Sequence, residues 1–296
     1  MTTEAPIVIV GTGLSGYSLA REIRKQDKDT AIVMVTADDG FSYSKPMLST
    51  GFTKGKDAEG LAQASADAMT DQLNLQLRTF ATVTGIDTDA HELVIGDERL
   101  RYSKLVLAWG ADVIRLGIEG DGHEYVFSIN DLMDYRAFRD ALVGKKRVAI
   151  MGAGLIGCEF ANDLRNGDVE VDVIAPSDTL MPGLLPRPAA EAVKAELEAL
   201  SVGFHLETVV DRIDRAGEGV RLTLANGETL EADMVISAVG LRPRTDLAKA
   251  SGIAVNRGIV VNRALETSAP DVYALGDCAE VDGHVLLYVL PLMACS

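Results

Sequence analysis

Two glycine-rich stretches are the residues of this chain whose spacing points most directly to chemistry. The first reads GTGLSG over 11–16, and the second reads GAGLIG over 152–157. Each follows an apolar run and precedes a stretch with helical periodicity. Such a turn lets a pyrophosphate approach the backbone, and the amides at the start of the following helix, with the positive end of its dipole, face the phosphates. The chain is therefore expected to bind two dinucleotides.

The residues expected to line the two sites are those of the turns themselves. In order along the chain they are Gly11, Thr12, Gly13, Leu14, Ser15 and Gly16, then Gly152, Gly154, Leu155, Ile156 and Gly157. One such motif is a weak indication of a nucleotide site, but two, each between an apolar strand and an amphipathic helix, are a strong one. The alternative is a pair of glycine-rich turns that bind no ligand.

The dinucleotide fingerprint also includes an acid about twenty residues further on, which binds the ribose hydroxyls. After the first turn this region holds Thr36, Ala37 and Asp38, so Asp38 is the candidate, in an imperfect register. After the second turn Ala175 occupies the position, with Asp178 just beyond. No arginine cluster stands there to hold a 2′-phosphate, which favours NADH over NADPH.

The elements around the turns predict an α/β fold that opens in the same way twice. The expected order is strand, glycine turn, helix and strand, over 6–10, 14–25 and 31–35, and again over 146–151, 158–166 and 169–175. This order begins a parallel, doubly wound sheet of the Rossmann type. Further signals predict a helix within 57–72, strands near 74–78, 80–88 and 104–111, helix caps at Asn130 and Asp131, and hairpins at Gly96-Asp97 and Asn226-Gly227.

The simplest division of the chain gives one nucleotide-binding domain over 1–112, a second over 113–244 and a final stretch over 245–296. Short strands expected at 259–261 and 272–275 could return to the first sheet. The second domain would then be inserted into the first.

Composition excludes several classes of function. The 296 residues carry a net charge of −16 and are 47% hydrophobic, which is ordinary for a folded protein of two domains. No basic stripe is present, so nucleic acid is not an expected partner. No apolar run reaches the ~18 residues that span a bilayer, and the start lacks a basic leader. We expect no membrane insertion and a cytoplasmic location.

The cysteines and histidines form no recognisable site. The three cysteines are Cys158, Cys278 and Cys295, and no two of them have the spacing of a redox pair. Cys158 and Cys278 are expected to serve packing. The four histidines are scattered without metal-ligand spacing, so no metal site is expected.

Two further segments carry a family resemblance. YALGDCA at 273–279 and VISAVGLRP at 235–243, together with the two glycine turns, resemble two-dinucleotide-binding flavoproteins, namely the pyridine nucleotide–disulfide oxidoreductases and their ferredoxin-reductase relatives. The resemblance implies FAD at the first turn and NAD(P)H at the second, with NADH favoured. It implies that Asp277 binds the flavin ribityl chain. It also implies cofactor contacts at Val83, Ala108, Trp109, Gly240 and Val289.

This chain departs from the family pattern in two places. Family members usually have ATG where this chain reads AWG at 108–110, so Trp109 either packs near the flavin or fills the core. Members also continue into a third, smaller domain after the helix that 289–296 would begin. The interface domain is therefore expected to be missing from this sequence, either because the sequence is truncated or because the protein lacks the domain.

Disulfide reductases of this class carry a close cysteine pair on the first helix or in the loop after it. Segments 14–26 and 36–52 contain no cysteine, so a dithiol relay is not expected. YSKPMLSTGF at 43–52, GAGLIGCEFANDL at 152–164 and SAVGLRPRT at 237–245 are similar to the bacterial reductases of rubredoxin within this family. That resemblance implies electron flow from NADH through FAD to the iron of rubredoxin, as in alkane hydroxylation. We expect the protein to be a monomer.

Lys45 and Glu159 are the expected active-site residues. By resemblance Lys45 lies beside the flavin, where its cation would stabilise negative charge on the reduced ring. Glu159 lies in the first turn of the second helix, where it could pair with Lys45. The alternatives are a solvated loop lysine and a first-turn carboxylate that the helix dipole favours.

Two other functions remain open at this stage. The electron acceptor could be a two-iron ferredoxin or another metalloprotein. Alternatively, the chain could be a redox-sensing flavoprotein with slow turnover. Measuring the NADH-driven reduction of each carrier distinguishes a ferredoxin acceptor from rubredoxin. Slow flavin reduction with a long-lived charge-transfer complex would favour a redox sensor.

Overall fold

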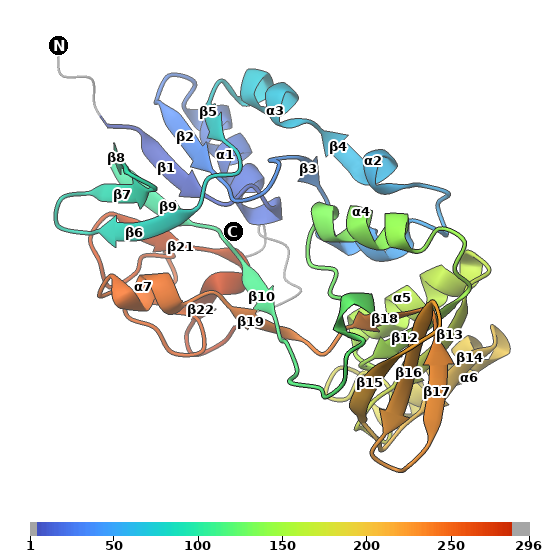
Figure 1. Ribbon diagram of the computed structural model, residues 1–296. Coiled ribbons are helices and arrows are strands. Elements are labelled where there is room, and N and C mark those ends of the chain that lie inside the picture. Colours follow the sequence, from blue (N-terminus) through green and yellow to red (C-terminus); the bar gives the residue numbers. More distant parts are fainter. Residues whose placement is uncertain (1–4, 286–296) are drawn as a thin grey trace. The chain divides into compact units, whose positions relative to one another are not determined.

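The computed structural model describes residues 5–285, which form two compact units (Figure 1). Unit 1 takes residues 5–44, 62–112 and 241–285, and unit 2 takes 45–61 and 113–240. Unit 2 is thus inserted into unit 1 along the chain, as expected. The division differs from 1–112, 113–244 and 245–296 in one important respect, because residues 45–61 belong to unit 2.

Unit 1 is built on a five-stranded parallel sheet with the order β21-β9-β1-β2-β5. The strands, in chain order, are β1 (Ile7–Val10), β2 (Ile32–Val35), β5 (Gln76–Arg78), β9 (Lys104–Leu107) and β21 (Val272–Ala274). The strands β1 and β2 are apolar at every position because both faces of the sheet are covered. The final stretch of the chain therefore contributes a strand to the first sheet.

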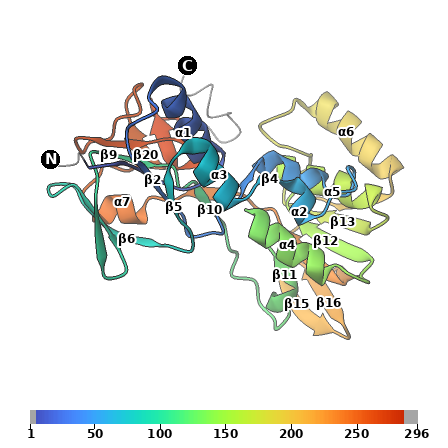
Figure 2. The same ribbon diagram turned by 90° about the horizontal axis from the view of Figure 1, so that it is seen from above.

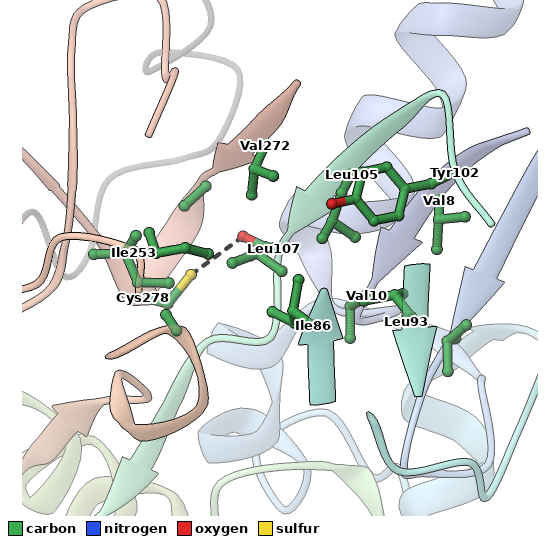
Figure 3. Packing of buried hydrophobic residues seen from close by; sticks show 14 of the residues in the cluster. Val8, Val10, Ile86, Leu93, Tyr102, Leu105, Leu107, Ile253, Val272 and Cys278 are labelled. Carbon is green, nitrogen blue, oxygen red and sulfur yellow. Dashed lines mark hydrogen bonds between the residues drawn. The ribbon is translucent and has the colours of Figure 1, made fainter. Parts of the chain in front are cut away.

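Helices cover one face of this sheet and a small antiparallel sheet covers the other. Ile9 and Met34 pack against α1 (Leu14–Gln26) and α3 (Ala66–Leu73). On the opposite face, Val8 and Val10 pack against β6 (Val83–Asp87), β7 (Glu92–Ile95) and β8 (Glu98–Arg101), a meander whose second turn contains Gly96 (Figure 3). The short helix α7 (Asp246–Ala250) joins this second face through Ala248.

Unit 2 repeats the plan. Its parallel sheet has the order β11-β18-β12-β13-β14. The strands are β11 (Val126–Phe127), β12 (Arg147–Met151), β13 (Glu170–Ile174), β14 (Val202–His205) and β18 (Met234–Ser237). The meander β15 (Val210–Ala216), β16 (Gly219–Leu224) and β17 (Thr229–Ala232) packs on the face that carries Ala149 and Met151. The helices of this unit are α4 (Leu132–Ala141), α5 (Leu155–Asn166) and α6 (Arg187–Ala199).

Short elements complete both units. β3 (Ser42–Tyr43) pairs with β4 (Ala62–Ala64), β10 (Ala111–Val113) with β19 (Leu241–Pro243), and β20 (Ile259–Val261) with β22 (Ala279–Val281). The helical turns are η1 (Lys45–Thr50), α2 (Ala58–Leu61), η2 (His123–Tyr125) and η3 (Gly276–Cys278).

Several sequence predictions need correction. The helix expected within 57–72 is divided by β4 into α2 and α3, and the strand expected over 104–111 ends at Leu107. The stretch 228–238, which follows the hairpin turn at Asn226-Gly227, forms two strands, since β17 pairs with the meander whereas β18 pairs with β12. The strand at 259–261 pairs with β22 and not with the first sheet. Asp131 caps α4 as predicted, accepting from the Asp134 amide at 2.8 Å.

Candidate functional site

The first glycine turn closes tightly on its neighbours after β1. The Gly11 amide donates to the Val35 carbonyl at 2.8 Å, and the φ of Gly11 is +109°. A Cβ at Gly11 would lie 2.3 Å from the carbonyl oxygen of Ala108, and one at Gly16 would lie 1.9 Å from that of Gly11. Both positions exclude any side chain because strand, turn and helix meet there backbone to backbone.

Gly13, the middle glycine of this turn, faces open space. It is the N-cap of α1, no side chain caps the helix, and nothing lies within 4 Å of the position its Cβ would take. The first amides of α1, at Leu14, Ser15 and Gly16, are among the donors that a helix start leaves without an intrahelical partner. An open approach to such amides fits a bound pyrophosphate.

The second turn reproduces this geometry in unit 2. Gly152 has a φ of +111°, and its Cβ would lie 2.4 Å from the Ala238 carbonyl oxygen. A Cβ at Gly157 would lie 2.0 Å from the Gly152 carbonyl oxygen, whereas Gly154, the uncapped N-cap of α5, faces open space. Leu155 and Ile156 begin α5. Each turn follows the strand at which the sheet order reverses, where nucleotides bind in folds of this kind.

Three polar residues form a cluster beside the first turn. Thr36 Oγ1 donates to Asp38 Oδ1 at 2.7 Å, and Thr12 Oγ1 lies 3.0 Å from that same oxygen. The Gly40 amide donates to it at 2.9 Å. The carboxylate expected to bind a ribose is therefore oriented by a residue of the turn itself, while Ala37 is exposed.

The YALGDCA segment lies at the start of α1. A Cβ at Gly276 would lie 2.3 Å from Ser15 Oγ, and the Leu275 amide donates to the Leu107 carbonyl at 3.1 Å. Asp277 follows in η3. The structure therefore brings the segment of Asp277 beside the first turn, although the two are far apart in sequence.

Of two other expected FAD contacts, Val83 lies within the described residues and Val289 does not. Val83 begins β6, two residues after Ala81, whose amide donates to the Thr36 carbonyl at 2.8 Å. This bond places the segment of Val83 next to the Asp38 cluster. Val289 lies outside the described residues.

Trp109 is fastened to the segment that re-enters unit 1. Its indole Nε1 donates to the Arg244 carbonyl at 3.0 Å, and Arg244 Nη1 donates back to the Trp109 carbonyl at 2.7 Å. Arg244 Nε also donates to Asp112 Oδ1 at 2.6 Å. The ring packs against the core cluster on the meander face. The carbonyl group of Ala108, which precedes Trp109, packs against the first turn at Gly11, as that of Ala238 packs against the second turn at Gly152. Gly240, two residues after Ala238, has a φ of +109°.

Lys45 and Glu159 both lie in unit 2, and each has a partner that the sequence analysis did not assign. Lys45 Nζ donates to Asn130 Oδ1 at 2.6 Å, and Ser49 Oγ donates to Glu159 Oε2 at 2.6 Å. Asn130 was recognised only as a cap residue ahead of α4, and Ser49 had no feature that marked it. Lys45 is half-buried, and Ser49 is buried in η1.

The region after β13 combines a buried alanine with an acidic surface. Ala175 is 2% exposed, and its amide donates to the His205 carbonyl at 3.0 Å. Beyond it, the guanidinium of Arg187 pairs with Asp178 and lies 4.0 Å from Glu191. The arginine in this region is therefore neutralised by neighbouring carboxylates.

The described thiols are buried and inert. Burial, with a smaller contribution from the charge of Glu159, raises the pKa of Cys158 to about 11. Burial raises the pKa of Cys278 to about 12, and its Sγ donates to the Leu107 carbonyl at 3.3 Å (Figure 3). A thiol reacts as its thiolate, so neither is suited to redox exchange near pH 7. Residues 5–285 hold no disulfide partner for either of them.

Residues 5–285 contain neither a membrane-spanning helix nor a cluster of metal-ligating side chains. No helix there is long and apolar enough to cross a membrane. In the same range, no group of three or more His, Cys, Asp or Glu is arranged to hold a metal ion.

Comparison with known families decides the class of this protein. The family model described as pyridine nucleotide-disulphide oxidoreductase matches residues 5–289. The chain belongs to this family. A curated relative named rubredoxin-NAD(+) reductase, from Alcanivorax borkumensis, is 54% identical over 98% of this chain and 76% of its own length. A second of the same name, from Acinetobacter baylyi, is 47% identical over 97% of this chain and 75% of its own length.

A solved structure supports the same assignment. The ferredoxin reductase from Rhodopseudomonas palustris matches with a TM-score of 0.89 at 26% identity, over 99% of this chain and 74% of that one. The pyridine nucleotide-disulphide oxidoreductase fold therefore accounts for both Rossmann-like units, one of which is inserted into the other along the chain. The described part of this family member contains two cysteines, one in each unit, and both are free.

Proposed function

We propose that this chain is an NADH-dependent, FAD-containing oxidoreductase that passes electrons one at a time to rubredoxin. The carrying observation is 54% and 47% identity, over nearly the whole chain, to proteins named rubredoxin-NAD(+) reductase. The inert thiols support an acceptor outside the chain, because residues 5–285 contain no dithiol to relay electrons. The same proposal includes a cytoplasmic location, a monomeric state and a role in alkane hydroxylation.

Each cofactor has a turn that fits it. FAD would be held by the first turn, with Asp38 at its ribose and Asp277 at its ribityl chain, and NADH by the second turn. The open N-caps Gly13 and Gly154 support this assignment, since each leaves room for phosphates at a helix start. A bound flavin accepts two electrons as hydride and releases them singly, which is the chemistry this reaction needs.

The protein itself has to bind, orient and supply charge. The two turns bind phosphates through backbone amides, so they position the cofactors without adding a reactive group. Lys45 would supply a cation beside the flavin, and Glu159 would pair with it. No general acid or nucleophile is required for transfer of a hydride.

We expect Asp178→Ala to raise the use of NADPH relative to NADH by about tenfold. The substitution removes the carboxylate that pairs most closely with Arg187, so the guanidinium near the expected ribose position keeps the longer ion pair with Glu191, at 4.0 Å. A guanidinium released from Asp178 can bind a 2′-phosphate through charge-assisted hydrogen bonds, worth roughly 1.5–3 kcal/mol. The measurement is kcat/KM with each nucleotide.

The matched control is Glu170→Ala. Glu170 pairs with Arg147 at 2.9 Å at the other end of β13, and its side chain is similarly exposed. This control should leave the nucleotide preference unchanged. If Asp178→Ala behaves like the control, then the 2′ position lies elsewhere.

The test of the proposed function is a visible spectrum followed by anaerobic titration with NADH, with and without rubredoxin. We expect a yellow protein that NADH bleaches and that rubredoxin re-oxidises over many turnovers. Faster reduction of a two-iron ferredoxin than of rubredoxin would show that a ferredoxin is the preferred electron acceptor. Slow bleaching with a long-lived charge-transfer band would favour a redox sensor. A protein that stays colourless after reconstitution with FAD would overturn the proposal, and size-exclusion chromatography tests the monomer.

A further inference from the structure

Residues 45–61, which we call the strap, leave unit 1 and return to it at nearly the same point. The strap starts after β3 and ends before β4, and these two strands pair through Ser42 with Ala64 and Tyr43 with Ala62. All seventeen of its residues belong to unit 2, beginning with η1 and ending with α2. The strap therefore needs its own attachment within unit 2.

That attachment is one face of α5. Glu159, Asp163 and Asn166 are spaced four and three residues apart, so they form a single stripe along the helix. Glu159 accepts from Ser49 Oγ at 2.6 Å, and Asn166 Nδ2 donates to Thr53 Oγ1 at 2.9 Å. Asp163 lies between them and contacts the strap backbone.

Asp163 is the central contact of this stripe. Its Oδ2 accepts from the Phe52 amide at 3.1 Å and its Oδ1 from the Thr53 amide at 2.8 Å. The residue is 1% exposed. A buried carboxylate is costly unless its oxygens are hydrogen-bonded, and these two amides supply that compensation from consecutive residues of the strap.

The surrounding contacts hold the strap close to unit 2. A Cβ at Gly167, just past the end of α5, would lie 2.4 Å from the Phe52 ring. From α4, the Arg139 guanidinium lies 3.9 Å from the centre of that ring and donates to the Lys56 carbonyl at 2.9 Å. Figure 2 shows α2, the end of the strap, beside α4. The strap is thus held between α5 and α4.

We propose that Asp163 is a positioning residue that docks the strap on α5 and thereby keeps Lys45 and Glu159 in register with the second glycine turn. Lys45 opens the strap, and Ser49, four residues later in η1, binds Glu159 in the first turns of α5. Loss of the Asp163 contacts would release the middle of the strap and loosen both active-site residues. The catalytic part of this inference rests on the proposed function.

The test is Asp163→Asn in the full FAD-loaded chain, with two readouts. The first is trypsin cleavage after Lys54 and Lys56, which are exposed residues of the strap. The amide can satisfy only one of the two strap amides, and cleavage of an opening segment follows the population of its open form, so we expect cleavage about 10-fold faster. The second is the limiting rate of flavin reduction by NADH, which we expect to fall about 10-fold while FAD content and the Kd of NADH stay unchanged.

The matched control is Asp233→Asn. Asp233 also accepts from two consecutive amides, those of Lys146 at 2.7 Å and Arg147 at 2.9 Å, but at the start of β12 and away from the strap. It should leave both readouts at wild-type values. If Asp163→Asn does not fold, Asn166→Ala removes the single bond to Thr53 and should raise strap cleavage two- to threefold.

Wild-type cleavage in Asp163→Asn would overturn the docking. Faster cleavage with an unchanged rate of flavin reduction would overturn the positioning role. The cleavage measurement requires neither NADH nor rubredoxin, so it tests the docking of the strap on α5 even if the proposed function is wrong.

Discussion

A Gly11→Ala substitution should strongly destabilise the first parallel sheet. The added methyl group would lie 2.3 Å from the Ala108 carbonyl oxygen, and the φ of +109° is one that alanine rarely adopts. Backbone strain and overpacking each cost on the order of 1–3 kcal/mol, which together is a large share of a typical stability of about 5–15 kcal/mol. We expect the thermal midpoint of the FAD-free protein to fall by roughly 10 °C or more, measured by circular dichroism.

Gly13→Ala separates folding from cofactor binding. Gly13 has φ −62° and ψ −176°, which alanine adopts freely, and open space lies around its Cβ position. The FAD-free protein should therefore melt as the wild type does. The methyl group would stand where a pyrophosphate approaches, so FAD affinity should fall about 10- to 100-fold, measured by quenching of flavin fluorescence.

The equivalent change in unit 2 is the matched control. Gly154→Ala places the same methyl group at the second turn, which has the same open geometry. It should raise the KM for NADH and leave FAD content intact. If Gly13→Ala retains FAD with wild-type affinity, then the first turn does not hold the pyrophosphate.

These turns were predictable from sequence because part of their constraint is local. The glycines at 16 and 157 are required by backbone contacts within a strand–turn–helix unit, to the carbonyls of Gly11 and Gly152, and that requirement appears as fixed spacing, whereas Gly11 and Gly152 themselves meet carbonyls that follow a neighbouring strand. The equivalence of AWG at 108–110 and AVG at 238–240 could also have been seen, since each follows the strand next to a glycine turn. The sequence did not indicate that Ala108 and Ala238 contact the glycine turns through their backbone carbonyl groups.

The strap could not be predicted in the same way. Residues 45–61 have no apolar periodicity, and their attachment consists of polar contacts to a helix about 110 residues away in sequence. From the sequence, Asp163 is an ordinary polar residue of an amphipathic helix, but in the structure it is 1% exposed and accepts from two strap amides. The same limit applies to Asp233. Its carboxylate accepts from two amides at the start of β12, and the residue lies between β17 and β18.

On the proposal that Lys45 lies beside the flavin, Lys45→Ala should slow flavin reduction by NADH about 10- to 100-fold, because it removes an oriented cation that would stabilise negative charge on the reduced ring. The amine has a fixed direction, since Nζ donates to Asn130 Oδ1 at 2.6 Å. Such a group lowers the barrier without contributing much to ground-state binding, so the Kd of NADH should change less than about threefold. Stopped-flow bleaching of the flavin over a range of NADH concentrations separates the two quantities.

Lys54→Ala is the control within the same strap. Lys54 is exposed, and its Nζ donates to Met47 Sδ at 3.5 Å. Its loss removes the same charge from unit 2 without removing a directed cation, so the reduction rate should stay at the wild-type value. Lys45→Arg keeps the charge and should recover part of the rate. If Lys45→Ala weakens NADH binding while its limiting rate is unchanged, the charge acts on the nucleotide, and Lys45 has no role in the chemical step.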